Sequence, residues 1–304
     1  MSTAKISTLL ASPALKWAAG GWTFFILENL ILSENRTYLI TKLGDDGYHY
    51  FYGALSTTAM GTVGYAYLRK VRAAAPLLWN VGGPVPRGAM MASFALNALG
   101  LGMASQSFPK LQIPVALVNV SAEESDGGAA PSVMGPSSPQ QVATATAPSR
   151  AWKVRCPFDF TDSRAQTGTN DSGTGAADIH GLDRITRHPG LWAFGILGLG
   201  NALLVPSLPQ RVWLSMPLMV AWIGGAHTDS RHRRGMGGQL RPELDSVTSN
   251  VPFWAMLNGS QGNVGKALMD FGGEVKGLNA AIATGAAAMW VLRRGRGKAP
   301  AFVR

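Results

Sequence analysis

PGLWAFGILGLGNALLVPSLPQ, residues 189–210, is a stretch without a single Asp, Glu, Lys or Arg. Residues 47–68 and 88–109 share this property. Only 14% of the chain is charged, where a soluble domain typically has about 25%, and the charges are missing in blocks rather than thinned evenly. Because about 20 apolar residues in a helix cross the ~30 Å hydrocarbon core of a bilayer, these blocks predict transmembrane helices.

Three further apolar stretches complete the predicted fold, an all-α integral membrane bundle of about six transmembrane helices. The expected helices are residues 14–33, 48–68, 88–106, 189–208, 211–228 and 277–292. The alternative is a soluble α-helical protein in which the same helices are buried.

A change of composition divides the chain. Residues 111–180 are dominated by Ser, Gly, Ala, Pro, Thr and Gln, as in GAAPSVMGPSSPQQVATATAPSR. Such a composition cannot bury enough apolar surface to order itself. We therefore expect a long, disordered, low-complexity insertion between helices three and four. It separates an N-terminal half of the bundle, residues 1–110, from a C-terminal half, residues 181–304.

The net charge of +10 lies mainly in basic clusters at the ends of the apolar stretches. Such clusters favour membrane lipids with anionic headgroups over nucleic acid as partners. Counted by side, the basic residues are nearly balanced, so the sequence does not choose an orientation. The N-terminus, with Lys5, Lys16 and no acidic residue before Glu28, weakly resembles an organelle transit peptide. A plastid or other organelle membrane is therefore favoured over the plasma membrane.

His188 is a candidate catalytic and cofactor-binding residue. It lies in RITRHPG between Arg187 and Pro189, with Arg184 close by, at the start of an apolar stretch. A cationic setting favours neutral imidazole, the form that binds a metal or haem iron. The alternative is that the RHP turn only anchors a helix among lipid headgroups.

GGAHTDSR, residues 224–231, ends the fifth expected helix. Its His227 is the second candidate ligand for a metal or haem. Asp229, with Arg231 beside it, is expected to form an ion-paired helix end.

Glu28 and Asn201 are polar residues inside expected transmembrane helices, and both are candidate catalytic residues. An ionisable group at membrane depth costs roughly 3 kcal/mol and persists mostly where it faces a partner or a cavity. Glu28 is therefore expected to point inward, although a shifted helix would let it reach the headgroups instead. No catalytic triad spacing, HExxH, P-loop or dinucleotide-binding motif supports a soluble hydrolase, protease or nucleotide-binding protein.

Several segments together resemble the NnrU membrane protein family, which includes the 15-cis-zeta-carotene isomerases. RITRHPGLWAFG, residues 184–195, is the most specific. VTSNVPFWAMLNG, residues 247–259, supplies Ser249, Pro252 and Phe253 as further motif residues. The remaining segments are ENLILSENRTYLITKLGDDGYHYFY at 28–52, PLLWN at 76–80 and GGAHTDSR at 224–231.

The resemblance implies a polytopic bundle and, for its isomerase branch, a haem b held between two histidines that isomerises a linear carotene without net redox change. This chain departs from that pattern, because the two places where the resemblance puts ligand histidines carry Glu28 and Asn201. His188 and His227 remain for another ligation.

Two function hypotheses follow. The first is an isomerase-like membrane enzyme acting on a carotenoid or other isoprenoid lipid. The second is a non-catalytic structural or accessory subunit of a membrane complex.

Overall fold

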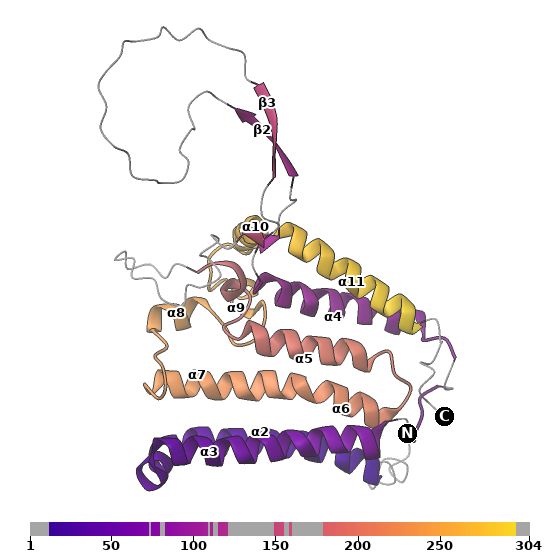
Figure 1. Cartoon of the computed structure of the whole chain (residues 1–304), viewed down its shortest axis with the longest axis vertical. Coiled ribbons are helices and arrows are strands. Elements are labelled where there is room, and N and C mark those ends of the chain that lie inside the picture. The colour runs from indigo at the N-terminus through magenta and orange to yellow at the C-terminus, as the bar shows by residue number, and fades with distance from the viewer. Residues whose placement is uncertain are drawn as a thin grey trace, which may run out of the picture.

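The computed structural model describes residues 12–72, 74–79, 83–108, 110–111, 115–120, 149–154, 158–159 and 179–295. Long helical segments lie side by side in these residues, in the spatial order α11, α4, α5, α6, α2, α3 (Figure 1). Their bounds are α2 (Pro13–Glu34), α3 (Arg36–Tyr65), α4 (Arg87–Gln106), α5 (Pro189–Ala202), α6 (Leu208–Met219) and α11 (Gly277–Gly295). The π-helix η1 (Ala66–Val71) extends α3, and the π-helix η4 (Val220–Gly224) joins α6 to α7 (Gly225–Arg233).

The expected helices correspond to these segments, with differences where glycine and proline intervene. α3 begins at Arg36 and bends sharply at Gly44, whose φ of 75° suits glycine, so the expected helix 48–68 is the part after the bend. α5 ends at Ala202, earlier than expected. Pro206 disfavours helical backbone in the residue before it, and Ser207 caps the next helix by accepting a hydrogen bond from the Gln210 N–H.

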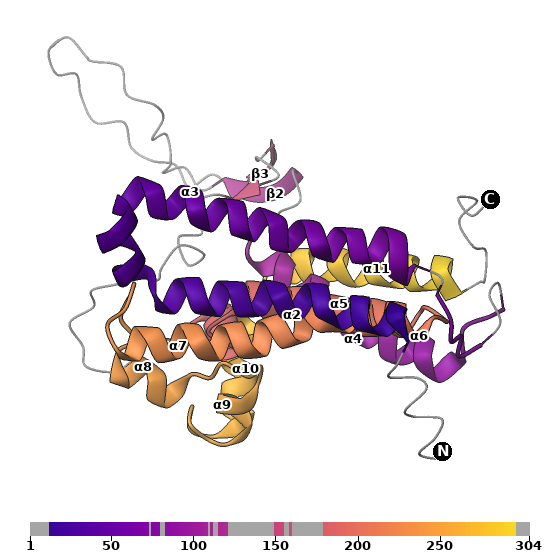
Figure 2. The same cartoon turned by 90° about the horizontal axis from the view of Figure 1, so that it is seen from below.

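Short helices gather at the end of the bundle where α5 and α11 begin (Figures 1 and 2). They are η3 (Gly181–Arg184), α8 (Pro242–Val247), α9 (Trp254–Leu257) and α10 (Val264–Glu274). α10 meets α11 at 90° and exposes Leu268 and Met269. This geometry suits a helix that lies along a surface rather than across the bundle.

The bundle is all-helical, as expected, and two short antiparallel strand pairs lie outside it in the expected insertion. β1 (Lys110–Leu111) pairs with β4 (Phe158–Asp159), and β2 (Val115–Val120) with β3 (Ser149–Val154), both antiparallel. The β2–β3 ribbon projects away from the bundle (Figure 1). Its sequence VALVNV is rich in β-branched valine, a local preference that the composition of the whole insertion obscured. The other residues of the predicted disordered insertion lie outside the described residues.

The length and apolar surface of the helices indicate which of them could lie in a membrane. Among the described helices, α4 is long and apolar enough to cross a membrane, and the bent pair α10 and α11 would make a second span. The six-span arrangement therefore stays a prediction. Large apolar side chains are nevertheless exposed along the long helices, among them Leu27, Ile31, Met91, Phe194 and Met289. Such a surface needs lipid or protein to cover it.

Glycine permits the close contact between α5 and α6. A Cβ added at Gly195 would lie 2.9 Å from the Leu218 Cα and 3.1 Å from the Pro217 carbonyl oxygen. Both neighbours are backbone atoms, which cannot move aside alone. Small residues that let helix backbones approach are the usual solution where lipid removes the hydrophobic drive between helices.

Gly195→Ala should therefore separate α5 from α6 and lower the melting temperature of the detergent-purified protein. The expected loss is about 1–3 kcal/mol, as for overpacking in a close-packed interior. Gly190→Ala is the matched control in the same helix, because a Cβ there meets no atom within 4 Å. Equal melting temperatures for the two variants would contradict the close contact.

Candidate functional site

The two most specific sequence motifs meet in space at the start of α5. The Arg187 N–H donates to the Ser249 carbonyl at 3.0 Å, and the Phe253 N–H to the Ile185 carbonyl at 2.9 Å. Between them, the buried Thr186 hydroxyl donates to the Asn250 carbonyl. Pro252 precedes Phe253, whose φ of 63° turns the chain into α9. RITRHP and VTSNVPF thus form one clamp.

Asp229, in the middle of α7, holds this clamp through its carboxylate. Its Oδ2 accepts from Arg187 Nη2 at 2.6 Å, and its Oδ1 is 2.8 Å from His188 Nε2. The Asp229 side chain is only 5% exposed. Pro189 then begins α5, where a missing N–H costs nothing.

A second carboxylate extends the network outward. Asp245 accepts from Arg187 at 3.0 Å and from Arg233 at 2.6 Å. Burial acts to raise the pKa of Asp229, but hydrogen bonds from His188 and Arg187 and the Arg187 charge outweigh it and lower this pKa below its ordinary value. The hydrogen bond from Arg233 likewise lowers the pKa of Asp245. Both groups are therefore stable anions rather than proton donors near neutral pH.

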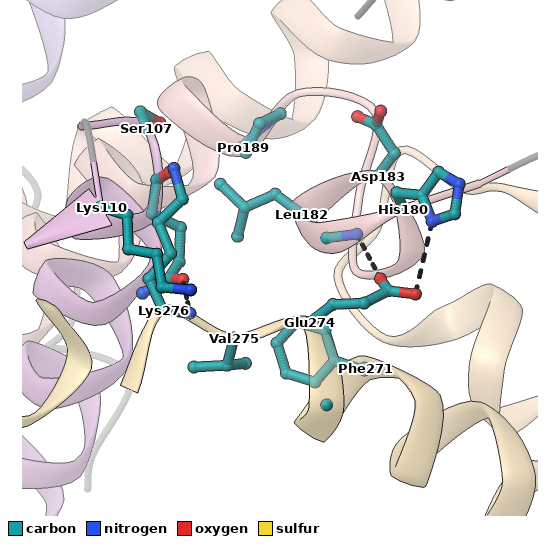
Figure 3. A pocket seen from close by; sticks show the side chains of 13 residues that line it. Ser107, Lys110, His180, Leu182, Asp183, Pro189, Phe271, Glu274, Val275 and Lys276 are labelled. Carbon is teal, nitrogen blue, oxygen red and sulfur yellow. Dashed lines mark hydrogen bonds and ion pairs between the residues drawn. The ribbon is translucent and has the colours of Figure 1, made fainter. Parts of the chain in front are cut away.

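A pocket of about 270 Å³ lies beside the clamp, between the end of α4, η3 and the junction of α10 with α11 (Figure 3). Arg184 closes one wall by donating to both oxygens of Glu274, at 2.9–3.1 Å. His180 Nδ1 lies 3.4 Å from the same carboxylate. Burial acts to raise the pKa of Glu274, but hydrogen bonds from Arg184 and the Gly181 N–H lower it.

Two lysines line the opposite wall of this pocket, where Lys110 and Lys276 face Asp183 and His180 across the opening (Figure 3). Lys276 is 8% exposed, and its Nζ donates to the carbonyls of Gln106 and Phe108. Since Gln106 is the last residue of α4 and Phe108 follows just after it, Lys276 acts as a cap on that helix. The pocket combines charged walls with an apolar floor that includes Leu182, Pro189, Phe271 and Val275.

His227 faces away from this region. Its Nε2 lies 2.8 Å from the Ser33 hydroxyl of α2 and 4.0 Å from Glu34. Residues two apart on a helix do not share a face. His227 therefore projects to the opposite side of α7 from Asp229, the hydrogen-bond partner of His188. Arg231, further along α7, buries an Nε that has no hydrogen-bond partner among the described residues.

Glu28 is buried, with 6% of its surface exposed, and it faces α3. Its Oε2 accepts from the Asn29 side chain at 2.8 Å, while the Tyr52 hydroxyl donates to Asn29 Oδ1 at 2.6 Å. The other carboxyl oxygen, Oε1, has no hydrogen-bond partner among the described residues. Glu28 therefore points inward, as expected, but its polar neighbours are Asn29, Tyr52 and Ser56 rather than His188, His227 or Asn201.

Asn201 lies on the other side of α5, where it joins three helices. Its Nδ2 donates to Asn97 of α4 at 3.1 Å, and its Oδ1 accepts from Trp290 of α11 at 2.7 Å. The Asn201 amide thus donates a hydrogen bond to one neighbouring helix and accepts one from another, so it holds helices together.

The described residues do not fit a haem held between two imidazoles. The Trp22 and Phe194 rings lie 6.2 Å apart, so these two residues of α2 and α5 are at the same height along the bundle axis. Glu28 lies six residues toward one end of the bundle and Asn201 seven residues toward the other, so about 20 Å separates them along the axis. His188 and His227 both use Nε2 for hydrogen bonds to different helices. In the described residues, no group of three or more His, Cys, Asp and Glu could hold a metal ion.

Sequence reasoning missed several residues that complete these sites. Glu274, Lys276 and Asp245 lie in a polar stretch that offers no periodic or motif signal. Asn29 and Tyr52 stand within a quoted family segment, yet only the pairing of α2 with α3 brings them together.

The fold and the clamp define a helical-bundle protein whose helices carry little charge and whose polar corner is tied by a buried arginine–aspartate–histidine cluster. The family model described as NnrU protein matches residues 18–293. The chain belongs to the NnrU family. No curated protein and no solved structure matches it. The family match and the apolar α4 support membrane association.

The clamp predicts a pH dependence. The folded-state pKa of Asp229 is lowered, so its carboxylate stabilises the fold fully above the ordinary value of 3.8, and this contribution is lost as pH falls toward the lowered value. Asp229→Asn should cost about 3–5 kcal/mol at neutral pH, because Arg187 and His188 lose their buried partner. The wild type should lose more thermal stability than this variant between about pH 5 and about pH 3. Glu243→Gln, an exposed site, is the control; an equal loss in all three proteins would contradict the network.

The separation of Glu28 and Asn201 predicts the behaviour of a double histidine variant. Glu28→His combined with Asn201→His, expressed with haem supplied, should not produce a bis-imidazole absorption spectrum, because one iron cannot reach both side chains across about 20 Å. The visible spectrum of the purified variant is the measurement. A bis-imidazole Soret band would show that the two helices bring these positions together.

Proposed function

We propose that this NnrU-family chain is an isomerase-like membrane enzyme that acts on a carotenoid or another isoprenoid lipid, in a plastid or related organelle membrane. The observation that carries the proposal is Glu28, a buried carboxyl inside an apolar helix whose Oε1 has no hydrogen-bond partner among the described residues. A buried polar atom of this kind is costly and is retained mostly where it serves a function.

An apolar groove on the same two helices supports a lipid substrate. It has a volume of about 340 Å³ and is lined by Trp17, Gly20, Gly21 and Phe24 of α2, with Thr62 of α3 and Lys16 at one end. Phe24 precedes Glu28 by one helical turn and shares its face. A linear polyene lying in this groove would therefore approach the carboxyl from within the bilayer.

Proton transfer gives Glu28 a role that needs no redox group. In its protonated form, Glu28 would add a proton to one carbon of a conjugated polyene. The resulting cation is delocalised, so the bond order of a nearby cis double bond falls and the bond can rotate. The carboxylate then takes back the proton, leaving the isomer and the starting carboxylic acid. Asn29 would hold the carboxyl, and Tyr52 would hold Asn29.

The test is Glu28→Gln. Proteoliposomes containing a linear carotene with a central cis bond are kept in the dark, and the isomers are separated by chromatography. Loss of the proton donor should slow conversion by at least about a hundredfold, the usual scale of general acid–base catalysis. Glu34→Gln, at the exposed end of the same helix, should convert at the wild-type rate. Conversion by Glu28→Gln at the wild-type rate would remove Glu28 from the chemistry.

The second candidate function is a non-catalytic subunit of a membrane complex. It is favoured by the structural use of His188 and Asn201, whose side chains are occupied in holding helices together. A wild-type protein that converts no carotene and comigrates with a large complex would decide for this function.

A further inference from the structure

The end of the bundle where α2, α4 and α6 begin and η1 and α11 end is entirely basic among the described charged residues. We call it the basic end, and its members come from five separate segments. They are Lys16, Arg69, Lys70, Arg72, Arg87, Arg211, Arg293 and Arg294. All except Arg211 are exposed, and no ion pair in the described chain involves any of them.

The opposite end has a different charge pattern, because its cations are mixed with carboxylates. Every described acidic residue except Glu28 lies there. Arg184 pairs with Glu274, Arg187 with Asp229, and Arg234 with Glu34. The two ends thus differ: the opposite end pairs several of its arginines with carboxylates, whereas the described cations of the basic end form no ion pair.

Aromatic rings accompany the cations at the basic end. Lys70 lies 5.9 Å from the Tyr65 ring, Arg211 lies 4.5 Å from the Trp79 ring, and Arg294 lies 4.7 Å from the Trp290 ring. Trp17 packs edge-on against Tyr65 at 5.5 Å. Tryptophan and tyrosine favour the boundary between hydrocarbon and headgroups, and basic side chains reach past them to the phosphates.

We propose that the basic end is a binding surface for anionic phospholipid headgroups. Cations gathered without counter-charges repel one another, and a layer of phosphates relieves that repulsion. They surround the ends of apolar helices, beside rings suited to the interface, so a lipid leaflet fits better than a soluble acidic partner. This proposal is independent of any catalytic function of Glu28.

The test is lipid titration of the full chain in neutral detergent, with tryptophan fluorescence quenched by brominated phosphatidylglycerol or brominated phosphatidylcholine. The wild type should bind the anionic lipid at least about tenfold more tightly. Replacing Arg69, Lys70, Arg293 and Arg294 together by Gln should abolish that preference. The matched control replaces four exposed, unpaired cations of the opposite end by Gln, namely Arg36, Lys42, Arg241 and Lys266, and should keep it.

High salt provides a second measurement on the unaltered protein, which stays valid if the quadruple variant fails to fold. About 1 M salt shortens the screening length to about 3 Å and should remove the preference for phosphatidylglycerol while leaving binding of phosphatidylcholine unchanged. Equal binding of the two lipids by the wild type, or equal loss in the two quadruple variants, would overturn the proposal.

Discussion

The buried carboxylate of Asp229 is the interaction on which the polar end of this protein depends. It accepts from Arg187 and His188 at once, and so joins the middle of α7 to the start of α5. The same arginine reaches Asp245 and the Thr248 carbonyl, which fixes the segment that returns toward α9. A charge buried to this degree is tolerated because both carboxylate oxygens accept hydrogen bonds and a buried arginine lies beside it. The motif residues that mark the family are therefore explained first by folding.

The helices beyond this corner are joined by a few polar contacts, some of which reach past the next helix in the row. Asn201 links α4, α5 and α11, while Trp213 of α6 donates to the Val63 carbonyl of α3. Glycine at the α5–α6 contact has no side chain, so the two backbones can approach closely. Close packing of this kind holds helices together where their apolar side chains face outward. Glu28 is an ionisable residue buried within these apolar helices, and for that reason it carries the functional proposal.

The two ends of the bundle differ in how their charged side chains are paired. One end builds its arginines into a folded polar corner with a pocket beside it, and these ion pairs lower the pKa values of Asp229, Asp245 and Glu274. The other end presents cations and aromatic rings outward. Such a difference suits a protein whose ends meet different surroundings. The α2–α3 groove starts at the basic end, where Lys16 and Trp17 line it, and runs along the apolar helices as far as Phe24.

The sequence by itself determined the helix positions and the burial of Glu28, because charge-free blocks and an isolated carboxyl are local signals. Family membership could be predicted too, since RITRHP and VTSNVPF are contiguous segments. The partners of the candidate residues could not be predicted. Whether Asn201 meets Glu28 or Trp290 depends on which helices are neighbours and at what level, and hydropathy carries no information on either. The strands of β2 and β3 were hidden by the composition around them. Only the tertiary structure separated His188 from His227 and brought basic residues of five segments together at one end without a described carboxylate, because both results arise from contacts between segments far apart in the chain.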